Sequence, residues 1–220
     1  MVCHTELLQG LSRTACKTLL TAGRLQHASA GDRLFRQGSP SNVCYVILSG
    51  EIRLVQLTPG GKRVIIDILG PGKHLGFFVA LSDKQYPVTA EVIEDCDLYA
   101  WNAPVIRNLL LKNQQLTMNV LSALTDRVTC LQIKVQQFAT ERVEQRIANS
   151  LLALARRMGK EQKDGILINM PLTHQDLAEM SGTNIYSVSR VLHKWEDEKI
   201  IATGRKRILL RAPEQLSLIS

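Results

Sequence analysis

With 220 residues, 45% of them hydrophobic, the chain has ample core for one large domain or two small ones. Its formal net charge of +7 favours a polyanionic partner, although many basic proteins bind none. No run approaches about 18 apolar residues, no signal-peptide pattern is present and the five cysteines are widely scattered, so we expect a cytoplasmic protein without a membrane span, disulfide framework or metal site.

The first half of the chain changes from a helical to a strand pattern. Residues 5 to 22 are predicted to form a helix, because leucines recur there at spacings of three and four. From about Gly31 to Trp101, short runs rich in Val, Ile and Tyr alternate with Gly, Pro and Asp. Such regular short strands indicate a sandwich or barrel, most simply a jelly roll, whose core could close around a small ligand. The strand candidates are CYVILSG, EIRLVQL, RVIIDIL, VTAEVIE and CDLYAW, and Pro59-Gly60-Gly61-Lys62 is predicted to be a hairpin turn.

Residues 104 to 138 are predicted to form one long helix with a heptad pattern, in which seam positions recur at alternating spacings of four and three. So narrow a seam favours pairing with an identical helix in a parallel twofold dimer, and the alternative is a helix that lies on the barrel. Near its start, Gln114 and Thr117 either fix the register or face a ligand. The predicted apolar seam comprises Leu110, Leu121, Leu124, Val128, Leu131 and Val135.

The segment after this helix is predicted to begin a separate domain. Residues 138 to 140 are interpreted as a hinge, with Thr140 as the N-cap of a helix that runs to about Met158. The sequence GKEQKDG is interpreted as a polar turn and GILINM as a strand.

A β-hairpin wing is predicted near the end of the chain, from strands at 200 to 203 and 207 to 210. Its tip carries Arg205 and Lys206, where cations could contact phosphates, and the alternative is a solvated basic turn.

Residues 172 to 194 are predicted to form two short helices joined by a tight turn, with Gly182 in a left-handed conformation at the turn. Thr173 is predicted to be the N-cap of the first helix, and Thr183 or Asn184 that of the second. The second helix has an apolar stripe, and its opposite face carries hydrogen-bonding groups, one fixed cation and no acid. That face suits a DNA major groove, although an ordinary helical hairpin with a solvated face is the alternative. The predicted DNA-binding residues are Thr173, Thr183, Asn184, Tyr186, Ser187, Ser189, Arg190 and His193, with Arg205 and Lys206 from the wing.

This order of segments resembles the catabolite-activator/fumarate-nitrate-regulator (CRP/FNR) family of bacterial transcription factors. The resemblance covers nearly the whole chain and is carried by GDRLFRQGSPSNVCYVILSGEIRL, FATERVEQRIANSLLALARRMG and LTHQDLAEMSGTNIYSVSRVLHKWEDEKII. It implies an α+β fold with an N-terminal β jelly-roll sensor domain of the cyclic-nucleotide-binding type (residues 1–103). A dimerisation helix and hinge (104–139) and a winged helix-turn-helix domain (140–220) follow.

The resemblance also implies a function. We expect a homodimer, not an enzyme, that binds double-stranded DNA at a near-palindromic operator, with RNA polymerase as a further partner. Paired recognition helices would enter successive major grooves about 34 Å apart. Ser189 and Arg190 match the family's recognition helix, but Tyr186 stands where the family usually has a Glu that accepts from cytosine, so the neighbouring base preference is altered. Ile185 stands where the catabolite activator has a cation.

The predicted effector loop, GFFVALSDKQYPVTAEV, departs from the cyclic-nucleotide pattern. The family's Glu that binds the ribose is replaced by Phe77, and residues 88 to 90 lack the Arg that binds the cyclic phosphate. We therefore predict that cyclic AMP is not the effector. The effector-pocket candidates are Gly76, Phe77, Phe78, Val88, Thr89, Gln114 and Thr117.

The sequence leaves the identity of the effector open. An iron-sulfur cluster is not expected, because Cys3 and Cys16 are too few and too far apart. Haem-based sensing of nitric oxide or carbon monoxide is one alternative, with His4, His27 or His74 as axial donor. A redox-sensing or a buried inert Cys130, an apolar organic ligand, and no ligand at all are the others.

Two rival functions are disfavoured by the residues present. A jelly-roll enzyme of the cupin kind needs clustered His and Glu ligands, and the predicted barrel offers only His74 and scattered acids. A cyclic-nucleotide regulatory subunit that acts on a protein would lack both the nucleotide-binding Glu and Arg, and the winged C-terminus argues against it.

Overall fold

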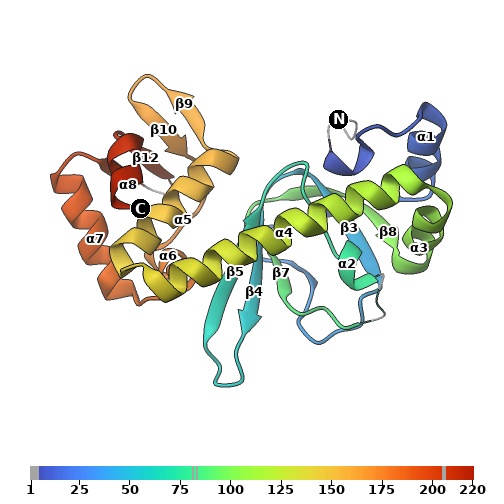
Figure 1. Cartoon of the computed structure of the whole chain (residues 1–220), viewed down its shortest axis with the longest axis horizontal. Coiled ribbons are helices and arrows are strands. Elements are labelled where there is room, and N and C mark those ends of the chain that lie inside the picture. Colours follow the sequence, from blue (N-terminus) through green and yellow to red (C-terminus); the bar gives the residue numbers. More distant parts are fainter. Residues whose placement is uncertain (1–4, 81, 83, 205–206) are drawn as a thin grey trace. The chain divides into compact units, whose positions relative to one another are not determined.

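The computed structural model describes residues 5–80, 82, 84–204 and 207–220 and shows an α+β protein, as predicted (Figure 1). Residues up to 131 form the bulk of one compact unit, and residues from 132 onward form the bulk of a second. Among the described helices, none is both long enough and apolar enough to cross a membrane.

The first unit contains two four-stranded sheets. One has the strand order β1-β8-β3-β6 and the other the order β2-β7-β4-β5. The strands are β1 (Arg24–Ala28), β2 (Arg33–Phe35), β3 (Val43–Ser49), β4 (Ile52–Leu57), β5 (Arg63–Leu69), β6 (His74–Leu75), β7 (Thr89–Val92) and β8 (Cys96–Asn102). All five strand candidates from the sequence are confirmed, whereas the short strands β1, β2 and β6 lack a continuous apolar run and were not predicted.

Two apolar clusters lie on opposite faces of the sheet that contains β3. Along β3, Tyr45 and Ile47 point into the interior between the sheets, where Leu54, Ala90 and Leu98 also pack. The alternate residues Cys44 and Val46 point to the other face. There they meet Trp101 and apolar side chains of the covering helices, which include Leu7, Leu19, Phe77, Ile106, Leu110, Leu116 and Val120. The period-2 alternation of a strand therefore supplies both cores.

The predicted helix over residues 5 to 22 is wrong as a single element. A 3₁₀ turn, η2 (Glu6–Leu8), is followed by Gly10 at φ +72°, and α1 (Arg13–Thr21) begins only after Ser12. The Ser12 hydroxyl accepts a hydrogen bond from the Ala15 amide at 3.2 Å and so caps α1. The turn residues between the two pieces override the leucine spacing.

The hairpin predicted at Pro59-Gly60-Gly61-Lys62 is confirmed between β4 and β5. The amide of Thr58 donates to the Lys62 carbonyl at 2.9 Å, and Gly61 has φ +76°, which glycine adopts at little cost.

The single helix predicted over residues 104 to 138 is also wrong. The chain forms α3 (Ala103–Lys112) and α4 (Gln114–Thr140), which are separated by Asn113 in an extended conformation. The Asn113 side chain accepts from the Leu116 amide at 2.9 Å, so it caps α4 in the manner of a turn residue. Leu110 is only 6% exposed and lies in the core beneath α3, so its assignment to the dimer seam is a second error.

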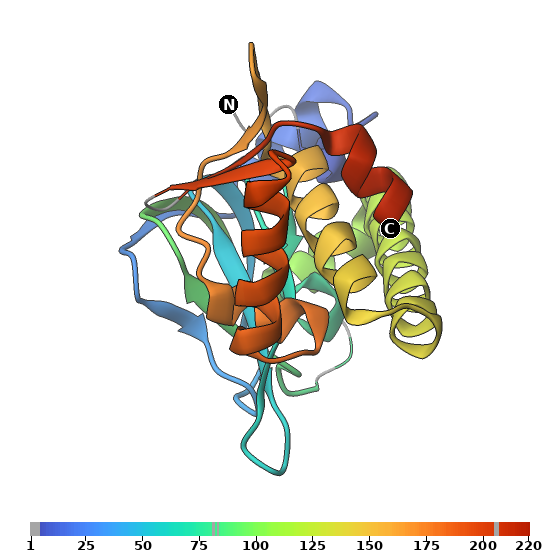
Figure 2. The same ribbon diagram turned by 90° about the vertical axis from the view of Figure 1, so that its left-hand side faces the viewer.

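The second unit is built from helices and a small antiparallel sheet with the strand order β11-β12-β10-β9 (Figure 2). Helix α5 packs against α6, α7 and α8. The elements are α5 (Val143–Met158), β9 (Lys160–Gln162), β10 (Gly165–Ile168), α6 (His174–Ser181), α7 (Ile185–Asp197), β11 (Ile201–Gly204), β12 (Arg207–Leu210) and α8 (Pro213–Ile219).

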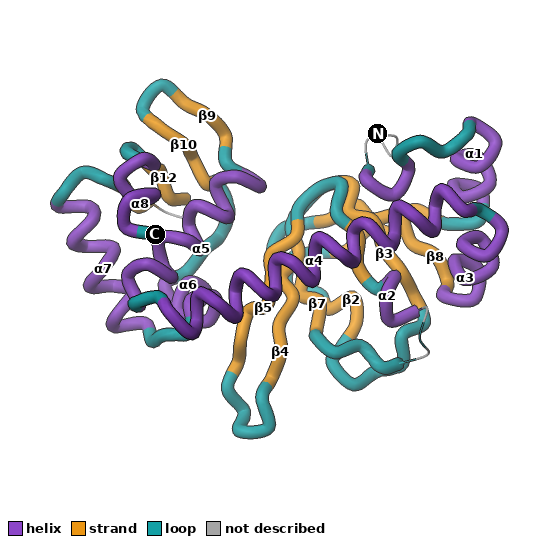
Figure 3. The backbone as a smooth tube through the Cα atoms, in the orientation of Figure 1, coloured by secondary structure: helices purple, strands orange, loops and turns teal. Residues whose placement is uncertain are grey.

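Two local predictions in this unit need correction. The segment GKEQKDG is not wholly a turn, because its residues 160 to 162 form β9 and pair with β10 (Figure 3). Thr140 does not cap α5; it is the last residue of α4, and its hydroxyl donates to the Gln136 carbonyl at 2.9 Å. Helix α5 begins after Arg142, whose amide donates to the Gln145 side chain at 2.9 Å.

Candidate nucleic-acid interface

Helix α6 and the turn after it are fixed by local hydrogen bonds that the sequence predicts. The Thr173 hydroxyl accepts from the Asp176 amide at 3.0 Å, while the Asp176 carboxylate accepts from the Thr173 amide at 3.0 Å. This reciprocal arrangement is a capping box. Gly182 then ends the helix in the left-handed conformation, with φ +62°. A side chain there would also meet the ring of Phe138 at 2.4 Å.

Helix α7 begins at the residue that the sequence left open between two candidates. The Asn184 side chain accepts from the Ser187 amide at 2.9 Å, so Asn184 rather than Thr183 is the N-cap. The buried face of the helix consists of Val188, Val191, Leu192 and Trp195. Because these buried residues are spaced three and four apart, the remaining side chains of the helix point outward.

The outward face of α7 carries the predicted DNA-binding side chains. Tyr186 is 83% exposed, and Arg190 and His193 are exposed as well, while Ser189 is half-buried beside them. Among the described residues, the Arg190 guanidinium has no ion pair or side-chain hydrogen bond. Its donors are therefore free for an external acceptor such as a guanine edge or a phosphate. His193 lies 3.4 Å from Glu196 on the same helix.

Not every predicted side chain is available to a ligand. The side chains of Thr173 and Asn184 serve as helix caps, and Ser187 is half-buried at the edge of the face. The two wing residues, Arg205 and Lys206, lie outside the described residues.

Contacts from α5 hold α7 and the end of α6 in place, and sequence reasoning missed both. Glu144 on α5 accepts from the Lys194 ammonium at 2.9 Å and from the Trp195 indole at 3.2 Å. The first of these bonds raises the pKa of Lys194. Arg146 on α5 donates to the Ser181 carbonyl at 2.9 Å and lies 5.5 Å from the centre of the Phe138 ring. No spacing rule links these residues, because they come from separate helices.

A third missed residue, Glu196, connects α7 to the wing. Its carboxylate accepts from the amide of Thr203 on β11 at 3.0 Å and also from the Thr203 hydroxyl. The hydroxyl contact is the main cause that lowers the pKa of Glu196. The end of the exposed helix is thus tied to the first strand of the wing.

The comparisons with known proteins agree with this arrangement. A family described as the cyclic nucleotide-binding domain matches residues 25–113, and one described as the Crp-like helix-turn-helix domain matches residues 145–219. The anaerobic regulatory protein of Bacillus subtilis is 28% identical over 185 residues, 83% of this chain and 78% of its own. The cyclic AMP receptor protein of Thermus thermophilus is 26% identical over 216 residues, 98% of this chain and 97% of its own.

Solved structures share the fold. That of FixK2 from Bradyrhizobium japonicum has a TM-score of 0.80 at 18% identity and covers 90% of this chain and 97% of its own. The chain belongs to the CRP/FNR family of transcription regulators. Members of this family regulate transcription by binding DNA, and the exposed face of α7 is the surface of this CRP/FNR protein that suits that role.

Helix α4 of this CRP/FNR protein carries an exposed apolar stripe. Five of the predicted seam residues are exposed: Leu121 (48%), Leu124 (37%), Val128 (45%), Leu131 (42%) and Val135 (69%). By contrast, Leu116 and Val120 on the same helix are buried in the first unit. The helix therefore has one side that packs in the core of the first unit and another that is apolar and that the described residues leave exposed.

The predicted effector-pocket residues do not come together in this CRP/FNR barrel. Phe77 on α2 (Phe77–Ala80) is 1% exposed in the cluster outside the β3 sheet, and Phe78 packs against that cluster. Val88, in contrast, packs against the interior cluster. The two faces of one sheet separate them, so they do not line one pocket.

Three of the four remaining pocket candidates have structural roles. Gly76 has φ +85°, and a side chain there would lie 2.6 Å from the Val43 carbonyl oxygen. The Thr89 hydroxyl accepts from the Gln37 amide at 3.0 Å. The Thr117 hydroxyl donates to the Leu110 carbonyl at 2.7 Å and helps close the junction of α3 and α4, while Gln114 is exposed at the start of α4.

His74 is the candidate axial donor with an unusual environment. Both ring nitrogens are buried and have no hydrogen-bond partner within residues 5–80, 82, 84–204 and 207–220. The ring lies between Phe77 and Phe78, at 5.4 and 5.6 Å between centroids, and burial lowers its pKa. His27, by comparison, is exposed and contacts Asp97 at 3.0 Å, and His4 lies outside the described residues.

The cysteines that the structure describes show no arrangement for a cluster. In the part of the chain that the structure describes, no group of three or more His, Cys, Asp or Glu residues could hold a metal ion. Burial raises the pKa of Cys44 to about 12 and that of Cys96 to about 11, which makes both thiols unreactive. Cys130 is exposed, so the interpretation of it as a buried inert thiol is wrong. Cys3 lies outside the described residues.

Proposed function

We propose that this protein acts as a homodimer that binds a near-palindromic operator through α7 and responds to an effector other than cyclic AMP. The observation that carries the proposal is the outward face of α7, where Arg190 is exposed beside Tyr186 and His193. A helix that presents a free guanidinium and hydrogen-bonding side chains along one face suits the major groove.

In this proposal Arg190 binds a guanine bidentately, and Ser189 and His193 contact neighbouring bases or phosphates. Tyr186 supplies a phenol in place of the family's carboxylate, so it cannot accept from a cytosine amino group as an anion. We therefore expect the base next to the guanine to differ from that of operators read by Glu. Arg205 and Lys206 would contact the DNA backbone.

The uncovered apolar stripe of α4 supports the dimer. Burying its leucines and valines against the same residues of a second copy removes apolar surface from water. This burial stabilises a dimer by roughly 25 cal/mol for each Å² of apolar surface. Residues repeated at heptad spacing suit a parallel twofold pair, which would present two α7 helices to one duplex. RNA polymerase is the further partner that we expect for a regulator placed at a promoter.

The barrel chemistry argues against cyclic AMP, which is named for the relative from Thermus thermophilus. Phe77 is buried in a core where the ribose-binding Glu would be, and Val88 is apolar where the phosphate-binding Arg would be. A nucleotide phosphate without a cation at that position would lose its strongest contact.

A haem-based gas sensor is the second candidate, and His74 is the observation that favours it. A buried imidazole with two unpaired nitrogens has the chemistry of an axial ligand. An absorption spectrum of the purified protein would show a Soret band if haem is bound, and its absence after reconstitution with haem would exclude this candidate.

The proposed function is tested by selecting binding sites from random-sequence duplexes with the purified protein. We expect a near-palindromic consensus with a guanine in each half-site. A selection that returns no consensus would overturn the proposal. Calorimetric titration with cyclic AMP tests the effector separately, and binding at micromolar affinity or tighter would refute that part alone.

A further inference from the structure

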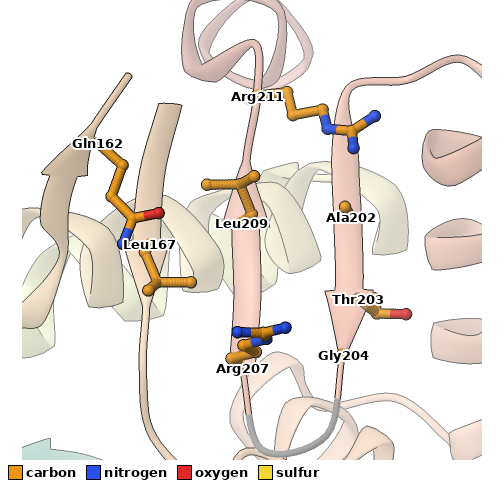
Figure 4. Close-up of a pocket in the computed structure, with 8 residues that line it drawn as sticks. All are labelled: Gln162, Leu167, Ala202, Thr203, Gly204, Arg207, Leu209 and Arg211. Atoms are coloured by element: carbon orange, nitrogen blue, oxygen red, sulfur yellow. The ribbon is translucent and has the colours of Figure 1, made fainter. Parts of the chain in front are cut away.

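The sheet of the second unit has one face that its helices do not cover. Strand alternation places Ile168, Ile201, Ile208 and Leu210 on the buried face. The intervening residues, Leu167, Ala202 and Leu209, are only half-buried on the other face. We name this second face the outer face of the sheet; Figure 4 shows it with its lining residues. It is distinct from the outward face of α7.

The register makes a continuous apolar row across the outer face. Leu209 on β12 pairs with Ala202 on β11 and with Leu167 on β10. Leu167 in turn pairs with Lys160 on β9. Three strands therefore contribute one apolar side chain each to the same row, with a cation at its end. Figure 4 shows Leu167, Leu209 and Ala202 on neighbouring strands.

Two arginines flank this row, Arg207 at the start of β12 and Arg211 directly after its end. Arg207 and Arg211 stand two residues before and two residues after Leu209, so the three side chains share a face. Both arginines are exposed, and among the described residues neither guanidinium has an ion pair or side-chain hydrogen bond. Their backbone positions are about 13 Å apart, at roughly 3.3 Å per residue. Together with Gln162 they border a trough of about 320 Å³.

We propose that the outer face binds an extended acidic segment of a partner protein. Two carboxylates four residues apart in an extended chain are about 13 Å apart and would reach Arg207 and Arg211 together. An apolar side chain midway between them would lie on Leu209. In a helix, residues four apart rise only about 6 Å along the axis, so a helical segment would not match the spacing of the two arginines in this way.

Other occupants match the face less well. A DNA backbone would pair with the two arginines but would leave the half-buried leucines facing phosphates and sugars. A small anionic ligand could pair with an arginine but would not cover the apolar row that runs across three strands. A partner segment with alternating charge and apolar character matches both features at once.

The probe for this proposal is a synthetic peptide with the core Glu-Ser-Leu-Ser-Glu, added to the ¹⁵N-labelled full-length protein. We expect amide shifts confined to β10, β11 and β12 and a measurable dissociation constant. Matched peptides with Lys in place of both Glu, or Ser in place of Leu, should bind at least about fivefold more weakly. Equal binding of the three peptides, or no binding of any, would overturn the proposal.

Two protein variants locate the contact. Arg211→Glu should weaken the acidic peptide at least about fivefold but leave affinity for a selected DNA duplex unchanged. Arg190→Ala should weaken DNA binding and leave the affinity for the peptide unchanged, because Arg190 lies on α7. If Arg211→Glu weakens DNA binding while the peptide still binds, the outer face contacts DNA and the proposal is wrong. Thermal unfolding of each variant confirms that the sheet remains folded, and Leu209→Ser repeats the test without changing charge.

Discussion

The helix that suits DNA and the barrel that is expected to sense an effector differ in how their functional residues are distributed along the chain. On α7, Tyr186, Arg190 and His193 share one face because spacings of four and three residues place them there. In the barrel, Phe77 and Val88 are separated by one sheet and pack in different clusters. A surface formed by one element can be predicted from periodicity, whereas a site assembled from several strands cannot.

The largest effect is expected for a charge on the apolar stripe of α4. Leu124→Lys should abolish dimer formation and operator binding, because two ammonium groups would be buried against each other along the seam. Analytical ultracentrifugation and a mobility-shift assay measure the two effects. Ser122→Lys, an exposed position of the same helix away from the stripe, is the matched control and should change neither. A Leu124→Lys variant that remains dimeric would show that the α4 stripe is not the dimer interface.

A smaller loss of DNA affinity is expected from a substitution on the exposed face of α7. Arg190→Ala should cost about 1–3 kcal/mol in each half-site and should relax the preference for guanine. Arg156→Ala, an exposed charge on α5, controls for the change in net charge. Competition binding with operators that carry single-base changes measures both affinity and preference. If Arg190→Ala weakens binding to every DNA sequence equally, Arg190 contacts phosphates rather than a base.

The acidic-pH behaviour of the barrel gives a further test. Burial lowers the pKa of His74 in the folded protein. As the pH falls, the imidazole therefore takes up a proton first in the unfolded chain, near its ordinary pKa of 6.5. The free energy of unfolding should therefore be highest above pH 6.5 and should fall as the pH drops below it, by up to about 1.4 kcal/mol per pH unit. The charged groups that influence His74 are Glu6, Lys73 and Arg127. His74→Leu should remove this part of the pH dependence.

Glu51 provides a control of opposite sign in the same unit. Burial raises its pKa to about 7, with Glu94 as a secondary cause. The contribution of Glu51 to the free energy of unfolding is fully present below pH 4.5 and is lost as the pH rises through about 7. Denaturant titrations from pH 4 to 8 should thus show opposite changes in slope for His74→Leu and Glu51→Gln. An unchanged profile for His74→Leu would mean that the imidazole is not buried in solution.

The smallest effect is expected at the link between α7 and the wing. Glu196→Gln keeps the size of the side chain but weakens its bonds to Thr203, so DNA affinity should fall by a few-fold. Any stabilisation from the carboxylate should be present above its ordinary pKa of 4.5 and lost as the pH falls through its lowered pKa. Thr203→Val should give a similar change, and the double variant should not be additive. Additive losses would show that the two residues act separately.

The sequence predicts most of the fold because its signals are local. The strands have β-branched runs, Thr173 and Gly182 have the chemistry of a cap and a turn, and each behaves as expected. The failures arise where a single residue overrides a longer pattern. Asn113 breaks the heptad helix, and Gly10 divides the first one.

The candidate site shows the same limit. Arg190 and its neighbours follow from one helical period, but Glu144 and Glu196 could not be found, because their partners come from other elements. The burial of His74 without partners depends on how β6 and α2 pack, which no spacing in the sequence encodes.

The most direct test of the central claim is the spacing between half-sites of the selected operator. In the proposed dimer, two α7 helices held by one α4 pair would have to meet the same side of the duplex. Inserting about five base pairs, roughly half a helical turn, between the half-sites should reduce affinity to that of a single half-site. Undiminished binding to the lengthened operator, measured on the same protein preparation, would contradict a rigid pair of recognition helices.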